Sequence, residues 1–341
     1  MTFLSDKAME RLRKSAAAPD LSGTRYTLRE FLARGGMGAV YAAEDESLGR
    51  RVALKVLDMP EAQPDFAERL LREARVLAQL EHPGIVPVHD AGRLPDGRAF
   101  YVMKLVDGAR LDEFLAHTPG LPERLRLFLR VCDAVSFAHA RGILHRDLKP
   151  ANVMVGAFGE VLVMDWGLAK VLGGSEGVRR NEAETTQIAA SDPAQVSGDE
   201  ATTQATAVTA DGAVMGTAGY MSPEQAAGRA AAIDARSDVF SLGKLLEFVA
   251  EGAAGGGSAI QWKQLRAVCA KARAQEPADR YATVAELSRE VARVLDGDRV
   301  AAYRESLADR LGRFYQRYQA AILLIAMYLL MRTLFILYPH R

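Results

Sequence analysis

The stretch His145–Asn152, HRDLKPAN, decides how the rest of the chain is interpreted. It brings an acid, a basic residue and an amide close together as Asp147, Lys149 and Asn152. A mostly apolar run with helical spacing precedes the stretch, and the β-prone VMV follows it. A rigid loop between packed elements is where catalytic side chains tend to lie, so we expect these residues to be functional.

The first part of the chain predicts three strands and a glycine-rich turn. Aliphatic runs bounded by turn residues predict strands over Tyr26–Arg34, Ala39–Asp45 and Arg51–Asp58. The turn ARGGMGAVY lies between the first two strands. Glycines in such a turn let the backbone approach a phosphate group without side chains in the way. The turn alone is a weak signal.

Lys55 is expected to meet a buried carboxylate. It lies mid-strand in VALKVL, where Ala53 and Leu57 share its face. A lone lysine of this kind is more often an edge residue that reaches water. However, the helix predicted from about Asp65 to Leu80 carries Glu73 in its apolar stripe. A carboxylate on a buried face is costly unless a cation meets it, and Lys55 is the candidate partner.

Together these motifs resemble those of the bacterial serine/threonine protein kinases of the eukaryotic type. The resemblance runs from about Tyr26 to Leu295 and includes further motifs in order. These are MDWGLAK with Asp165, in which Trp166 replaces the usual Phe, GTAGY with Thr217, MSPEQA with Glu224, SDVFSLG with Asp238, and PADRY with Arg280.

The resemblance implies an α+β, two-lobed protein kinase fold, with a small β-rich N-lobe, a larger helical C-lobe and a C-terminal hydrophobic helix. The expected divisions are an N-terminal arm (1–25), the N-lobe (26–106), the C-lobe (107–298), a juxtamembrane helix (299–319) and a membrane helix (320–338).

The resemblance also implies ATP and Mg²⁺ as cofactors, and it assigns the site residues. Asp147 would take the proton of the attacking hydroxyl, Lys149 would neutralise the transferring phosphoryl group, and Asn152 with Asp165 would bind magnesium. The implied ATP site comprises Ala33, Gly35, Gly36, Gly38, Val40, Ala53, Lys55, Glu73, Met103, Lys104 and Val106.

Five further residues have implied structural roles. Asp238 would brace the catalytic loop, and Arg280 would pair with Glu224. Thr217 would mark serine/threonine specificity, and Arg146 would await an activation-loop phosphate.

The predicted activation segment, from Asp165 to Glu224, is long. From about 173 to 212 it contains few large apolar residues, so we expect that part to be disordered. The preferred phosphoacceptors are Thr203, Thr206 and Thr209. Phosphorylation of one copy by another in a homodimer is a possible route.

Composition excludes some partners. Lys plus Arg and Asp plus Glu both number 43, which gives no reason to expect nucleic acid as a partner. Cys132 and Cys269 each lie in an apolar helical pattern, which is typical of buried free thiols in a reducing compartment. The expected partners are protein substrates.

The last predicted segment, 320–338, has about the length needed to span a bilayer. Its ten Leu, Ile and Phe residues favour insertion by roughly 3 to 6 kcal/mol, against about 3 kcal/mol lost for Arg332 at mid-depth. Basic residues on the near side predict an inner-membrane, single-pass kinase with a cytoplasmic catalytic domain. A helix lying on the membrane or on a partner, with a cytoplasmic protein, is the alternative.

Two other functions remain open at this stage. Ala33 replaces the family's first loop glycine, AEGAAGGGSAIQW shortens a region where the family has a docking helix, and the activation segment is long. These departures favour a membrane-anchored pseudokinase scaffold, whereas the complete set of charged catalytic residues favours an enzyme. A small-molecule kinase is disfavoured by Thr217 and the SPE motif.

Overall fold

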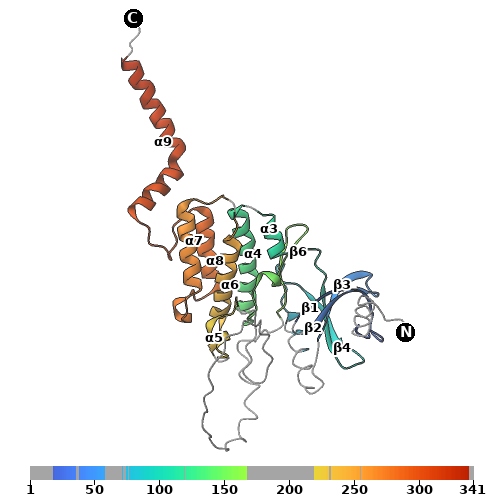
Figure 1. Cartoon of the computed structure of the whole chain (residues 1–341). Helices are drawn as coiled ribbons and strands as arrows, with labels where there is room; N and C mark the ends of the chain where they lie inside the picture. Colours follow the sequence, from blue (N-terminus) through green and yellow to red (C-terminus); the bar gives the residue numbers. More distant parts are fainter. Residues whose placement is uncertain are drawn as a thin grey trace, which may run out of the picture.

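The computed structural model describes residues 18–35, 38–57, 71, 74–75, 77–118, 120–166, 219–229, 232–253 and 255–337. Strands gather at the N-terminal end of the molecule and helices at the other, as Figure 1 shows. This is the two-lobed α+β arrangement that the sequence predicted.

The N-lobe is built on one antiparallel sheet with the strand order β1-β2-β3-β5-β4. Its second and third strands are almost fully buried because aliphatic side chains fill both faces. The strands are β1 (Tyr26–Gly35), β2 (Gly38–Asp45), β3 (Arg50–Leu57), β4 (Val88–Arg93) and β5 (Ala99–Lys104).

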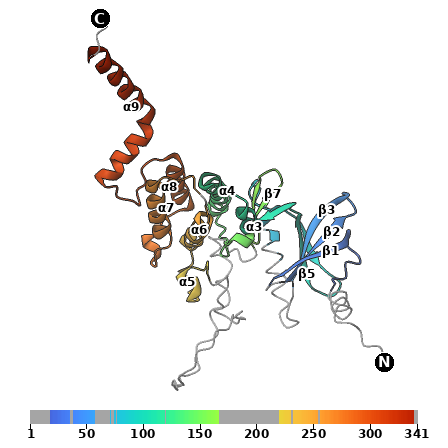
Figure 2. The same ribbon diagram turned by 45° about the horizontal axis from the view of Figure 1, so that its top comes forward.

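The C-lobe packs its helices around one continuous hydrophobic core, and Figure 2 shows them as a group beyond the sheet. The helices are α3 (Leu111–Ala116), α4 (Leu121–Ala140), α5 (Pro223–Ala226), α6 (Ala235–Ala250), α7 (Ala259–Ala272) and α8 (Val284–Asp296). Helix α6 has apolar or small residues on almost every side, and its buried residues, among them Val239, Leu242 and Leu245, belong to this core.

A small sheet, β6-β7-β8, lies where the two lobes meet. It consists of β6 (Gly108–Arg110), which the sequence did not predict, β7 (Val153–Gly156) and β8 (Val161–Val163). The Val163 amide donates to the Gly84 carbonyl at 2.8 Å, and the Val86 amide donates to the Val163 carbonyl at 3.3 Å. These bonds fix the strand that delivers Asp165 against the N-lobe connection.

The link between α6 and α7 is as short as predicted. Residues 251–258 connect them, and no helix lies in the described part of this link. Arg124, on α4 and only 5% exposed, closes the region. Its guanidinium donates to the carbonyls of Leu115, Thr118, Val249 and Glu251.

Helix α9 (Leu307–Leu337) extends away from the C-lobe (Figure 1). The predicted juxtamembrane helix 299–319 is corrected here: residues 299–306 are not helical, and one helix continues through 307–337. Near its start, Asp309 accepts hydrogen bonds from Lys263 of α7 and from Tyr303, both at 2.9 Å. Over the residues that the structure describes, no helix combines the length and apolarity needed to cross a membrane.

Several predicted features lie outside the described residues. They are most of the N-terminal arm (1–17), Gly36, Glu73, the segment 173–212 with Thr203, Thr206 and Thr209, and Thr217.

Candidate active site

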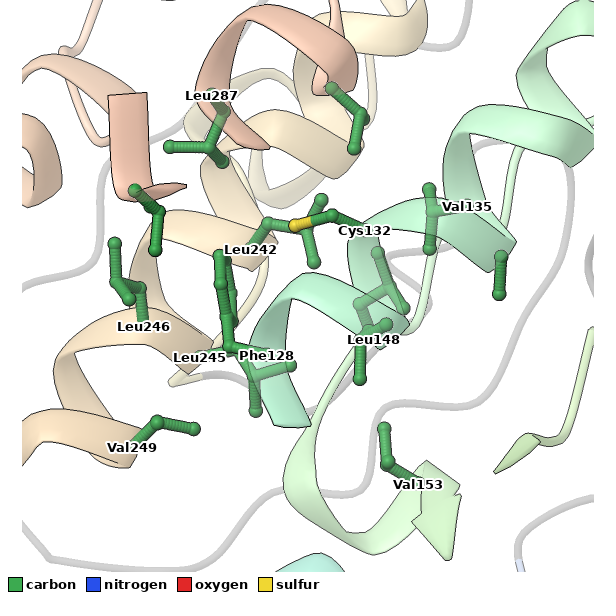
Figure 3. Packing of buried hydrophobic residues seen from close by; sticks show 14 of the residues in the cluster. Phe128, Cys132, Val135, Leu148, Val153, Leu242, Leu245, Leu246, Val249 and Leu287 are labelled. Atoms are coloured by element: carbon green, nitrogen blue, oxygen red, sulfur yellow. The ribbon is translucent and has the colours of Figure 1, made fainter. Parts of the chain in front are cut away.

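The catalytic loop is anchored in the core at its middle and just after its end. Leu148 lies inside the loop and Val153 follows it, and both are fully buried. Figure 3 shows these two side chains in the same cluster as Phe128 and Cys132 of α4. Because the apolar anchors leave little freedom, the polar residues next to them are held in fixed positions.

Three polar residues of the loop hold one another. The Asn152 amide nitrogen donates to the Asp147 carboxylate at 3.0 Å and to the Asp147 backbone carbonyl at 2.7 Å. Lys149 forms an ion pair with the same carboxylate at 2.7 Å. The structure therefore brings Asp147, Lys149 and Asn152 together, and two neighbours orient the Asp147 carboxylate.

Asp238 of α6 stabilises the catalytic loop through its backbone, as the resemblance implied. Its carboxylate accepts hydrogen bonds from the backbone amides of His145 and Arg146, both at 2.8 Å. His139 of α4 contacts the same carboxylate at 2.7 Å. Burial alone would raise the pKa of Asp238, but His139, His145 and the backbone amides hold it below the usual value.

The backbone of Arg146 adopts a left-handed conformation, with φ of 66°. Such a conformation is uncommon for a side chain of this size, so its neighbours must hold it. Besides the Asp238 contact to its amide, the Arg146 carbonyl accepts a hydrogen bond from the side chain of Gln225 at 2.9 Å.

Lys55 forms an ion pair with Asp165 in this structure. Glu73, the partner expected from the sequence, lies outside the described residues. Burial would lower the pKa of Lys55, but neighbouring Tyr101 and Asp165 raise it overall, so the ammonium stays charged. The pairing places a buried positive charge beside a carboxylate of the opposite lobe.

A backbone hydrogen bond joins the segment that carries Asp165 to Asn152. The amide of Met164 donates to the backbone carbonyl of Asn152 at 2.8 Å, which brings Asp165 next to the catalytic loop. Since the Asn152 amide nitrogen faces Asp147, its side-chain oxygen remains as an acceptor. A carboxylate and an amide oxygen fit Mg²⁺, which takes few protein ligands.

Trp166 occupies a buried position directly after Asp165. Its indole nitrogen donates to the Val163 carbonyl at 3.1 Å, and its ring lies 4.6 Å from that of His145. The indole is 3% exposed, so the larger ring at this position is fully accommodated by the core.

The predicted adenine and phosphate positions line neighbouring strands. Val40 is paired with Lys55, and Ala53 is paired with Met103 in the sheet register. Lys104 ends β5, and Val106 follows in the connection to the C-lobe. The sheet register thus brings residues from β2, β3 and β5 to one region, as the resemblance implied.

The packing of β2 against β3 requires glycine at position 38, which the sequence did not reveal. Its φ is 147°, and a Cβ there would collide with the Val56 carbonyl of β3. The close approach of β2 to β3 therefore requires glycine at this position independently of any phosphate. Ala33, in contrast, lies in β1 and is exposed.

The end of the activation segment is fixed to α6. Glu224 and Arg280 form the predicted pair, with two hydrogen bonds of 2.8 and 2.9 Å, and both side chains are buried. Ser237 donates to Glu224 at 2.7 Å, and Ser241 donates to the Tyr220 carbonyl at 2.8 Å.

Four of the residues that complete this site were missed by the sequence analysis. His139, Tyr101, Ser237 and Gln225 each act through contacts that are distant in sequence, and none lies in a position singled out by periodicity. For Gln225 the one local signal was its place three residues after Ser222, a capping spacing at the start of α5.

Comparison with known proteins identifies the domain. Residues 26–297 match the protein kinase domain family. The serine/threonine-protein kinase PknB of Mycobacterium tuberculosis is 36% identical over 309 residues, covering 82% of this chain and 44% of PknB. The serine/threonine-protein kinase PknD of Protochlamydia amoebophila is 35% identical over 238 residues, covering 65% of this chain and 22% of PknD.

The fold has counterparts among solved structures. The crystal structure of the PknI kinase domain from Mycobacterium tuberculosis has a TM-score of 0.57 and 26% identity, covering 81% of this chain and 99% of that chain. The chain spans less than half the length of PknB and PknD.

Proposed function

This chain belongs to the protein kinase family, and from that premise we propose that it is a serine/threonine protein kinase that transfers the γ-phosphoryl group of ATP to protein hydroxyls. The observation that carries the proposal is the catalytic loop, where Lys149 and Asn152 both contact the Asp147 carboxylate. An acceptor carboxylate held in this way suits proton transfer from a substrate hydroxyl.

In this mechanism Asp147 orients the substrate hydroxyl and takes its proton as the oxygen attacks. Lys149, within 2.7 Å of Asp147, contributes positive charge where negative charge accumulates. The rest of the rate comes from positioning, which the buried anchors Leu148 and Val153 provide. No covalent step involving the protein is needed.

The family uses ATP and a divalent metal, and the residues present fit both. Asn152 and Asp165 would hold magnesium, and Lys55 would hold the ATP phosphates. The remaining contacts to ATP would come from Ala33, Gly35, Gly36, Gly38, Val40, Ala53, Glu73, Met103, Lys104 and Val106. When bound, ATP supplies the phosphoryl group, and magnesium neutralises its charge.

Regulation by phosphorylation is part of the proposal. Arg146 directly precedes Asp147, and a phosphate on the activation segment would offset its charge. Thr203, Thr206 and Thr209 are the proposed acceptors, modified by a second copy in a homodimer. Thr217 is proposed to select serine or threonine substrates.

Attachment to a membrane through α9 is also proposed. Consecutive residues leave no polar face in the middle of this helix, and their large apolar side chains are exposed: Leu323, Leu324, Ile325, Met327, Tyr328, Leu329, Leu330, Met331 and Leu334. A helix that is apolar on all sides suits a lipid environment better than water. Single-pass insertion with the kinase on the cytoplasmic side remains the sequence-based prediction.

The test of catalysis compares the full chain with Asp147→Asn. Purified protein is incubated with labelled Mg-ATP and a degenerate serine/threonine peptide mixture. We expect transfer by the parent and a decrease of about 100-fold or more in the variant. Equal labelling in both would contradict the assignment of Asp147. Nucleotide binding without transfer in both would favour the scaffold.

A further inference from the structure

The backbone of Arg146, the residue before Asp147, is held by two buried side chains from different elements. Arg146 has a left-handed φ of 66°, and its backbone amide donates to Asp238 of α6 at 2.8 Å. Its carbonyl accepts from Gln225 of α5 at 2.9 Å. This carbonyl belongs to the peptide bond that joins Arg146 to Asp147. The orientation of that peptide plane therefore sets the direction in which the Asp147 side chain points.

Both the oxygen and the nitrogen of the Gln225 side-chain amide make hydrogen bonds. It is 5% exposed, and its side-chain oxygen accepts from the backbone amide of Ser222 at 3.2 Å and from the Ser222 hydroxyl at 3.0 Å. A flipped amide would place NH₂ against the Ser222 N–H, two donors facing each other, so the contacts determine its orientation. The nitrogen must then point towards Arg146.

Helix α5 is in turn attached to α6. Glu224, next to Gln225, accepts hydrogen bonds from Ser237 and Arg280, and Ser241 bonds to the Tyr220 carbonyl. The contacts therefore form a closed ring from α6 through α5 and Gln225 to Arg146, and back to α6 through Asp238. Moving the end of the activation segment would remove one of the two supports of Arg146.

We propose that Gln225 is a positioning residue for the reaction: its side-chain NH₂ group holds the Arg146 carbonyl, so that Asp147 is correctly placed only when the end of the activation segment is docked on α6. This inference rests on the proposed kinase function. The Gln225 side-chain amide would thus couple the docking of the activation segment to the placement of Asp147, the proton acceptor.

A simpler role would be that Gln225 only caps α5. The two roles use different atoms, because the oxygen contacts Ser222 and the nitrogen contacts Arg146. Gln225→Glu keeps the size and the accepting oxygens but loses the NH₂ donor. Ser222→Ala removes a capping hydroxyl from the same helix. The Ser222 backbone amide, which still donates to the Gln225 oxygen, keeps the Gln225 nitrogen directed at Arg146, so this variant is the matched control.

The experiment measures steady-state phosphorylation of the degenerate peptide mixture by the full chain and both variants, with Asp147→Asn as the inactive reference. We expect kcat to fall about tenfold in Gln225→Glu with the KM for ATP unchanged, because one buried hydrogen bond in the catalytic loop is lost. Ser222→Ala should keep kcat within about twofold while lowering the unfolding midpoint.

Hydrogen exchange gives a second measurement that needs no activity. The amides of 145–149 should exchange faster in Gln225→Glu than in Ser222→Ala or the parent. Parental kcat and parental exchange in Gln225→Glu, or equal losses in both variants, would overturn the positioning role. A parent that transfers no phosphate, with the expected exchange pattern, would instead count against the proposed function alone.

Discussion

Glu224 and Arg280 are two buried residues of opposite charge that pair with each other. Glu224 and Arg280 are 3% and 4% exposed and join the activation segment to the turn before α8. Burial would raise the pKa of Glu224, but hydrogen bonds from Arg280 and Ser237 lower it from 4.5 to about 2. The folded state therefore binds this proton more weakly than the unfolded chain does.

This shift predicts an acid-dependent loss of stability. The contribution of Glu224 is complete above its unfolded pKa of 4.5 and is lost as the pH falls towards about 2. Between about pH 6 and about pH 3, we expect the parent to lose about 2 kcal/mol more unfolding free energy than Glu224→Gln, which cannot titrate. Urea unfolding at both pH values measures the difference. Parallel losses in the two proteins would count against the pair.

Lys55 is the second residue with a testable role. Lys55→Met keeps most of the side-chain volume but removes the charge that faces Asp165. We expect phosphoryl transfer to fall about 100-fold or more, because a fixed charge beside the phosphates is lost. Lys244→Met, on the partly exposed side of α6, is the control and should retain activity. Similar rates in the two variants would remove Lys55 from the proposed site.

The sequence predicted those residues whose roles follow from order and spacing. Asp147, Lys149 and Asn152 lie within one loop, and the structure places them in contact. Gln225 and Arg146 are 79 positions apart, so their contact depends on how α5 docks, which no local pattern shows. The same holds for His139 and Asp238, which are 99 positions apart.

At the scale of helices and strands, the short link after α6 is stabilised by the side chain of Arg124. Arg124 lies beside this link and donates to carbonyls at the ends of two helices, α3 and α6. Burial lowers the pKa of Arg124. The described contacts of this guanidinium are all with backbone carbonyls, so it acts as a cap for the ends of α3 and α6.

Replacing this cap should destabilise the C-lobe. Arg124→Met leaves buried carbonyls without their donors, and we expect a loss of about 2 to 4 kcal/mol of unfolding free energy. Arg126→Met changes an exposed arginine of the same helix that pairs with exposed Glu123 at 3.3 Å and should cost less than about 0.5 kcal/mol. Equal unfolding midpoints for both variants in urea would show that the cap is unimportant.

The helices and most strands were predictable because apolar spacing reports directly on burial. Strands β1, β2 and β3 begin and end within one residue of the predicted bounds. Strand β6 was missed because Gly108–Arg110 is short and has no alternating pattern. The start of α9 was also wrong, since Asp309 anchors the chain just after Leu307 and the preceding residues form a turn.

For the whole molecule, the most testable feature is the exposed apolar surface of α9. We expect the full chain to float with lipid vesicles, because exposed leucine and isoleucine side chains gain free energy on leaving water. A chain ending at Arg317, which keeps the contact of Lys263 with Asp309, should remain at the bottom of the gradient.

The same experiment distinguishes two kinds of attachment. Membranes washed with alkaline carbonate retain a spanning helix and release one that lies on the surface. Recovery of the full chain in the washed pellet would support single-pass insertion. Equal flotation of the full chain and the chain ending at Arg317 would rule out α9 as the anchor.

For the whole molecule, the sequence was sufficient to predict the two-lobed architecture, because the motifs occur together and in the order typical of that fold. It was not sufficient for the way in which the lobes meet. The bridge between Ile85 and Val163, and the pairing of Lys55 with Asp165, depend on side chains and strands that only the folded chain brings together.

Trp166 has a consequence for pharmacology. An inhibitor that works by displacing the side chain after Asp165 would have to break the indole bond to the Val163 carbonyl and empty a space that a bicyclic ring fills. Compounds that leave this ring in place avoid that loss of free energy. Chemical probes for this protein are therefore best sought among molecules that compete for the nucleotide position alone, and a gain in potency against Trp166→Phe would identify any that do not.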